Sequence, residues 1–164
     1  MYHDGHEEKT GSELVARHAE LIGRVTLMWN DVHAQASQLF QDFCASAEAR
    51  KRYSETQNDR IKRQLLLSVG SVALEKYPDL CERLEKTLIE LDRLAGDRNA
   101  AIHTYWAIDL PAGKILAHRR FPPHKRLRAD FEQQFEGLLE KLSNLWLSLF
   151  DLRIDYFDRK ARRD

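Results

Sequence analysis

Residues 14–43 read LVARHAELIGRVTLMWNDVHAQASQLFQDF, and apolar side chains recur in this stretch at every third or fourth position. That spacing places them in one stripe along an α-helix. With Ser12 as a candidate N-cap, it predicts a first helix over residues 12–46. A helix of that length measures about 50 Å. The stretch therefore places the chain in the all-α class.

Three more stretches repeat this period. They predict a second helix over residues 55–76, a third from Asp79 to about residue 103, and a fourth over residues 125–160, with a polar connection before the second. The second helix is expected to turn Ile61, Leu65, Val69, Val72 and Ala73 inward.

The period changes after Tyr105, where WAIDL and ILAH flank the turn-forming residues PAGK. This pattern predicts a small β-hairpin over residues 106–118. The elements together favour an antiparallel four-helix bundle with long first and last helices and the hairpin between the third and fourth helices. We expect residues 1–164 to form a single domain, with residues 1–11 as a flexible tail.

Composition narrows the classes of protein that the chain can represent. It has 164 residues, 43% of them hydrophobic and 32% charged, which excludes a disordered or membrane-embedded chain. No run reaches the roughly 18 apolar residues that span a bilayer, and the polar start lacks a signal-peptide core. We expect a cytoplasmic protein that makes no membrane contact.

The formal net charge is zero. Any binding of nucleic acid must therefore use a local patch of charge.

Several familiar site motifs are absent from the sequence. It has no Glu-x-x-His pair, no His-Glu-x-x-His, no phosphate-binding glycine loop and no Gly-x-Ser-x-Gly. We expect neither a metal ion nor a cofactor.

The apolar stripes of the first and last helices extend beyond the two shorter helices. A second copy of the chain would cover this surplus apolar surface most simply. The pattern therefore predicts a homodimer.

Residues 96–106, GDRNAAIHTYW, combine Arg98, Asn99 and His103 at the end of the third helix. Arginine presents a planar fork of donors to phosphate oxygens, and histidine exchanges a proton near neutral pH. With the 2′-hydroxyl of RNA as nucleophile, these groups suffice for phosphodiester cleavage, with Asn99 orienting Arg98 or contacting the phosphate.

Five residues of regular helix leave Arg98 and His103 about 140° apart. A shared site then needs a helix that ends near His103, a second copy across a twofold axis, or both. The alternative is structural, with Arg98 extending from the helix end and His103 contacting the last carbonyls.

Arg-Asn-x-x-x-His at the end of a late helix in a small helical protein resembles the HEPN family, the nucleotide-binding domains of higher eukaryotes and prokaryotes. The resemblance in specific residues covers Arg98 to Tyr105. It implies a metal-independent endoribonuclease that dimerises, acting as a toxin or in defence against phage, with Arg98 and His103 catalytic and Asn99 supporting. The extension Arg-x4-His-x-Tyr is similar to HEPN toxins whose nucleotidyltransferase antitoxin adds AMP to the tyrosine. Tyr105 would be that position, or an aromatic residue that packs at the start of the hairpin.

A basic run follows the hairpin. Residues 118–128 include Arg119, Arg120, Lys125 and Arg126, which could bind an RNA backbone. Two other functions stay open. One is a non-catalytic helical homodimer that binds a nucleotide or a protein, and the other is a nucleic-acid binder that uses this basic run.

Overall fold

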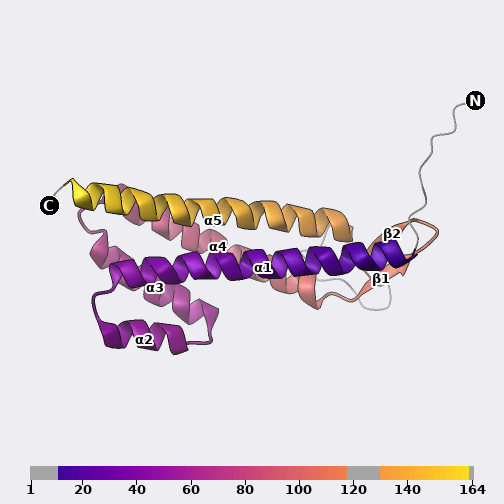
Figure 1. Ribbon diagram of the computed structural model, residues 1–164, viewed down its shortest axis with the longest axis horizontal. Helices are drawn as coiled ribbons and strands as arrows, with labels where there is room; N and C mark the ends of the chain where they lie inside the picture. Colours follow the sequence, from indigo (N-terminus) through magenta and orange to yellow (C-terminus); the bar gives the residue numbers. More distant parts are fainter. Residues whose placement is uncertain (1–10, 118–129, 163–164) are drawn as a thin grey trace, which may run out of the picture. The chain divides into compact units, whose positions relative to one another are not determined.

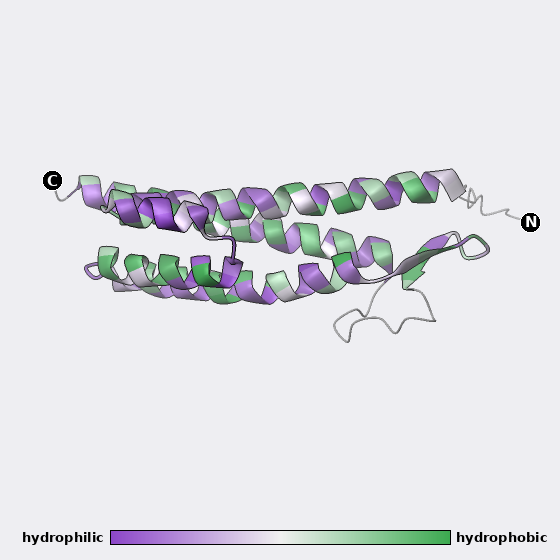
Figure 2. Ribbon diagram, turned by 90° about the horizontal axis from the view of Figure 1, so that it is seen from below, coloured by the Kyte–Doolittle hydropathy of each residue, from purple (hydrophilic) through white to green (hydrophobic). Residues whose placement is uncertain are grey.

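A computed structural model describes residues 11–117 and 130–162. Helices make up 81% of this part of the chain, which confirms the mostly helical class. The elements are α1 (Gly11–Phe43), α2 (Ala47–Glu55), α3 (Asp59–Ala73), α4 (Pro78–His103), β1 (Trp106–Asp109), β2 (Lys114–Ala117) and α5 (Phe131–Ala161) (Figure 1). The antiparallel hairpin lies between α4 and α5, as predicted. Hydrophobic residues alternate with hydrophilic ones along the helices, as Figure 2 shows.

The contacts divide the described residues into two compact units. Unit 1 comprises residues 11–27, 96–117 and 130–139, and unit 2 comprises residues 28–95 and 140–162. The long helices α1, α4 and α5 contribute to both units. No helix among residues 11–117 and 130–162 is both long and apolar enough to cross a membrane.

The hairpin contributes to the core of unit 1. The Trp106 ring packs edge-on against Phe131, with the ring centroids 5.1 Å apart, and also contacts Phe135. Both phenylalanines are fully buried, as is the inward stripe of this part of α1. In unit 1, the hairpin therefore covers part of the surplus apolar surface of the long helices. The sequence pattern suggested that a second copy of the chain would cover that surface. The homodimer stays a prediction.

Unit 2 shows the relative directions of its helices. His33 and Phe43 of α1 lie beside Asp59 and Gly70 of α3, in the same order along both helices. The α3–α4 contacts, Arg63 with Asp92 and Gly70 with Leu84, run in opposite order. The α4–α5 contacts, Asp79 with Arg159 and Arg83 with Asp155, also run in opposite order. Within unit 2, α1, α3 and α5 therefore run in one direction and α4 runs against them. The predicted antiparallel alternation does not hold for α1 and α3.

The short helix α2 explains this difference. It occupies part of the stretch predicted as a connection, so the described residues hold five helices where the sequence suggested four. Ser46 caps α2 by accepting a hydrogen bond from the amide of Ala49, which ends α1 before it reaches the predicted residue 46. The buried ring of Tyr53 stacks on Phe40 of α1, with centroids 4.0 Å apart. This contact brings the chain back along α1 before α3 begins.

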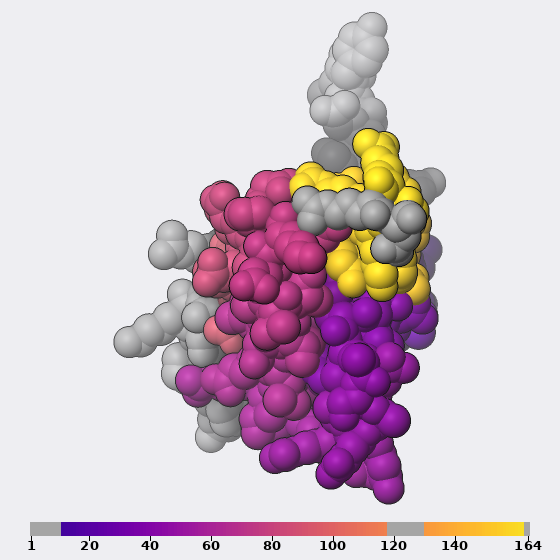
Figure 3. Space-filling view, turned by 90° about the vertical axis from the view of Figure 1, so that its left-hand side faces the viewer, coloured from indigo at the N-terminus to yellow at the C-terminus, as the bar shows by residue number. Residues whose placement is uncertain are grey.

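Other predicted boundaries and faces shift. The buried face of α3 consists of Leu66 and Gly70, whereas Val72, predicted to face inward, is 76% exposed. The last helix begins at Phe131, because Asp130 caps it through the amide of Gln133. Residue 11, predicted as part of a tail, already belongs to α1. Figure 3 shows the end of α5, in yellow, against other segments of unit 2.

The closest approach between α3 and α4 generates a prediction. A Cβ atom at Gly70 would lie 2.2 Å from Cδ2 of Leu84, which is fully buried. We expect Gly70→Ala to lower the free energy of unfolding by about 1–3 kcal/mol, as other overpacked cores do. Urea titration followed by circular dichroism measures this change.

Gly23 of α1 is the matched control, because a Cβ atom there would meet nothing within 4 Å. Gly23→Ala should raise the free energy of unfolding by about 0.5–1 kcal/mol, the usual gain at an exposed helical glycine. Equal effects of the two substitutions would contradict the close packing.

His18 of unit 1 generates a second prediction. Its ring packs edge-on against Phe131 at 4.4 Å, its Nε2 atom is buried, and burial lowers its pKa below 6.5. The unfolded chain therefore binds a proton below about pH 6.5 that the folded chain takes up only at lower pH. Stability contributed by neutral His18 is present above this pH and is lost as the pH falls through the two pKa values. We expect a lower melting temperature at acidic pH, and a smaller decrease in His18→Leu. A variant as sensitive to pH as the wild type would contradict this account.

Candidate functional site

The motif residues Arg98, Asn99 and His103 come from the last two turns of α4, in unit 1. The separation of Arg98 and His103 around the helix called for a helix that ends near His103, a second copy of the chain, or both. The helix does end at His103. Every residue from 98 to 103 is helical, however, so the helix does not loosen between the two side chains. Their separation of about 140° around the axis therefore remains.

Two side-chain hydrogen bonds hold the end of α4. The hydroxyl of Thr104 donates to the carbonyl of Ala100 at 2.7 Å, and the indole Nε1 of Trp106 donates to the carbonyl of Ala101 at 2.9 Å. Carbonyls in the last turn of a helix lack partners within it. Thr104 and Trp106 thus contact the carbonyls that the structural alternative assigned to His103.

Asn99 lies between the helix face that carries Arg98 and the one that carries His103. It lies one turn before His103 and therefore shares a helix face with it. The guanidinium Nη1 of Arg98 donates to the side-chain oxygen of Asn99 at 3.1 Å. This hydrogen bond draws the charged end of Arg98 toward the face that carries His103.

The motif is accessible from solvent. Asn99 and His103 are exposed, and Arg98 is half-buried. Tyr105 follows the helix end and is 62% exposed. Most of the tyrosine side chain is therefore accessible to solvent.

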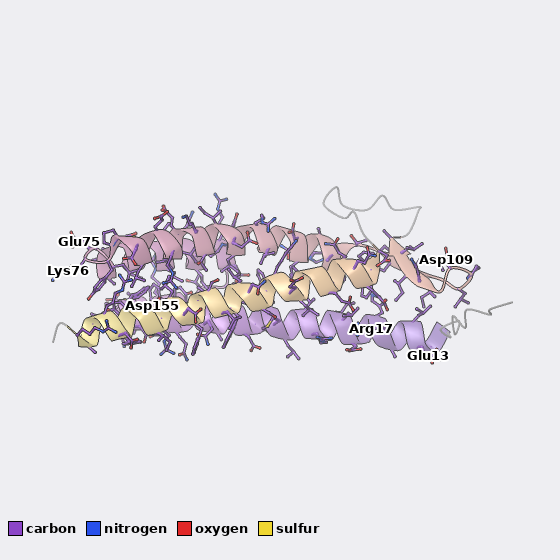
Figure 4. The ribbon with its side chains drawn as sticks, turned by 90° about the horizontal axis from the view of Figure 1, so that it is seen from above. Glu13, Arg17, Glu75, Lys76, Asp109 and Asp155 are labelled. Atoms are coloured by element: carbon purple, nitrogen blue, oxygen red, sulfur yellow. The ribbon has the colours of Figure 1, made fainter. Side chains whose placement is uncertain are left out.

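The hairpin continues directly from the motif. Trp106 pairs with Ala117 at its open end, and Asp109 pairs with Lys114 next to the turn. The side chain of Asp109, labelled in Figure 4, accepts a hydrogen bond from the amide of Ala112 at 3.2 Å. Gly113 closes the turn with a φ of +60°, which glycine adopts without strain.

The predicted RNA-binding residues Arg119, Arg120, Lys125 and Arg126 lie outside the described residues. The described chain stops after Ala117 of β2 and resumes at Asp130, both in unit 1. Their role stays a prediction.

The start of α5 and its neighbour on α1 form an ion-pair cluster that the sequence analysis did not identify. Arg17, labelled in Figure 4, contacts Glu20 of α1 and Glu132 and Glu136 of α5. More than 100 residues separate Arg17 from the last two, so sequence spacing could not signal the cluster. Arg17 is thereby surrounded by carboxylates.

Unit 2 contains a polar pair formed by His33 and Asp59. Nε2 of His33 lies 3.7 Å from a carboxylate oxygen of Asp59, and its ring contacts Trp29 at 4.7 Å between centroids. The pair joins α1 to the first turn of α3. This position indicates that the pair serves as a packing contact between the two helices.

A groove between α3 and α4 was also missed by the sequence analysis. It measures about 330 Å³, and its lining includes Arg63, Leu67, Ile89 and Asp92. Arg63 is ion-paired with Asp92 and is largely buried. The inward face predicted for α3 differs from the observed one, so residue spacing in the sequence could not bring these residues together.

No group of histidine, cysteine or acidic side chains suited to hold a metal ion occurs in the part of the chain that the structure describes.

Comparison with models of known protein families finds no match, and neither does comparison with curated proteins or with solved structures. The resemblance to HEPN proteins therefore depends on the motif and on the helical class alone.

Proposed function

We propose that the chain is an endoribonuclease of HEPN type. It would form a single HEPN-like helical domain and act as a homodimer in the cytoplasm. The observation that carries the proposal is the hydrogen bond from Arg98 to Asn99, one turn before the exposed His103. It joins a cation to an amide at a solvent-accessible helix end that also exposes an imidazole.

These groups can perform each part of RNA cleavage. A base removes the proton of the 2′-hydroxyl, and the oxygen attacks the adjacent phosphorus. The 5′-oxygen then leaves with a proton, giving a 2′,3′-cyclic phosphate and a free 5′-hydroxyl. We assign the proton transfers to His103 and stabilisation of the phosphorane charge to Arg98, with Asn99 holding the guanidinium in position. Because RNA carries its own nucleophile, the reaction does not require a metal ion.

The separation of Arg98 and His103 around the helix supports a composite site. Even with Arg98 drawn toward Asn99, the two side chains start from faces about 140° apart. A second copy related by a twofold axis could place its His103 opposite Arg98 of the first copy. We propose that each site takes these two residues from different chains.

The exposure of Tyr105 supports a further part of the proposal. An accessible phenol can accept AMP from ATP in a reaction that a nucleotidyltransferase catalyses. The phenol oxygen would attack the α-phosphorus of ATP and pyrophosphate would leave, which adds a charged group two residues after His103. Such a modification would block the site, as expected for a toxin held inactive by its antitoxin. The basic run from Arg119 to Arg126 would bind the RNA backbone.

The central prediction concerns the motif. Arg98→Ala and His103→Ala should each slow RNA cleavage at least about 100-fold, because each removes a group that acts in the transition state. Cleavage of labelled RNA is measured with EDTA present, and circular dichroism confirms that each variant is folded.

Two control substitutions accompany this test. Arg93→Ala removes another exposed arginine of α4, and Tyr105→Phe removes only a hydroxyl beside the motif. Both should cleave RNA at the rate of the wild type. If the two motif variants cleave as well as these controls, the chain is not a HEPN-type ribonuclease. Binding without cleavage by the wild type would favour the non-catalytic alternative.

A mixing experiment tests the composite site. When inactive Arg98→Ala and His103→Ala chains are mixed and exchange subunits, half of the dimers contain one of each. One of the two sites in such a dimer keeps both residues, so about a quarter of wild-type activity should return. No recovery after subunit exchange, verified by native mass spectrometry, would show that each site lies within one chain.

A further inference from the structure

The helix α5 carries a second apolar stripe on its exposed side, within unit 2. The buried stripe consists of Leu142, Leu145, Leu149, Leu152 and Tyr156. The second stripe consists of Leu147, Phe150, Ile154 and Phe157. Three of its members are exposed large hydrophobic residues: Leu147 at 49%, Ile154 at 44% and Phe157 at 41%. A helix that packs on one side only would carry polar residues at these positions.

The spacing of the second stripe is that of a coiled coil. Its residues follow one another at intervals of three, four and three, which makes Leu147 and Ile154 a positions and Phe150 and Phe157 d positions of a heptad. Trp146 stacks on Phe150, with ring planes 7° apart, and widens the stripe at its start. Two heptads are too few to order an isolated helix. Here α5 is already held by its buried side, so pairing would not require a new helix to form.

The charges beside the stripe are sorted by sign. The e positions hold Asp151 and Asp158, and the g positions hold Arg153 and Lys160. The guanidinium of Arg153 lies over the ring of Phe157 at 5.7 Å, at the edge of the stripe, where its Nε is bound to Asp42. One edge of the stripe is thus acidic and the other is basic.

This arrangement is complementary to itself. When two such helices pair side by side in parallel, the g residue of one faces the e residue of the next heptad in the other. Arg153 of each copy would then face Asp158 of its partner, twice by symmetry. Antiparallel pairing would instead set acidic edge against acidic edge and basic edge against basic edge.

We propose that this stripe is the interface between two copies of the chain, which pair through α5 in parallel and in register. The proposed ribonuclease needs a second copy but does not specify this surface, so the two proposals can fail separately. A dimer that cleaves RNA and is unaffected by changes to the stripe overturns the interface and leaves the ribonuclease standing.

Light scattering and sedimentation of the full chain test the proposal first. The wild type should be a dimer at micromolar concentration, and Ile154→Glu should raise its dissociation constant at least about 30-fold, the effect of a hot-spot residue. The matched control is Ile89→Glu on α4, where the side chain is 66% exposed and lies outside the stripe. It should leave the dimer intact. A monomeric wild type, or a dimer that both variants retain, overturns the proposal.

Disulfide formation tests the direction of pairing. Leu147 lies at one end of the stripe. Parallel pairing sets the two copies of Leu147 opposite each other, whereas antiparallel pairing about the centre of the stripe separates them by about 15 Å along the axis. Under mild oxidation, Leu147→Cys should form a covalent dimer much faster than Ile89→Cys, as the short span of a disulfide demands. Equal rates for the two variants overturn the parallel arrangement.

Discussion

The end of α4 at His103 is the constraint on which the proposed site depends. The side chains of Thr104 and Trp106 bind two carbonyls of the last turns, and the Trp106 ring packs against Phe131 of the next helix. The helix therefore cannot extend into the hairpin, and the hairpin is held by the core of unit 1. This end leaves Asn99 and His103 exposed on one face. A change at Trp106 would act on the motif without touching any of its residues.

The long helices and the hairpin were predictable because both have strong periodic signals. Leu21, Val25, Val32 and Leu39 are all fully buried at the spacing that the first helix required. The helix α2 was not predictable, because its sequence has no apolar stripe and its one buried side chain, Tyr53, is stabilised by a partner on α1. The prediction of which face of α3 is buried was wrong for a related reason. Its buried face depends on Gly70, which adds almost no hydrophobic signal but allows the close approach of Leu84.

The residues of the candidate site could be proposed from the sequence, but their geometry could not. The sequence singled out Arg98, Asn99 and His103, and the rotation of a helix showed that two of them face apart. The hydrogen bond from Arg98 to Asn99 depends on side-chain conformation, which residue spacing does not determine. The ion pairs of Arg17 with Glu132 and Glu136 depend on a helix contact between distant segments. Such contacts become visible only when the helices are placed together.

The common direction of α1 and α3 bears on how unit 2 assembles. The helices α3 and α4 are joined by four residues, 74–77, so their pairing closes a short loop. The pairing of α1 with α3 must wait until α2 has returned the chain along α1, which closes a longer loop at a higher cost in entropy. Contacts that are near in sequence generally form faster than distant ones. The short loop therefore favours early pairing of α3 with α4. The stack of Phe40 on Tyr53, which are close in sequence, returns the chain along α1 so that α1 can pair with α3.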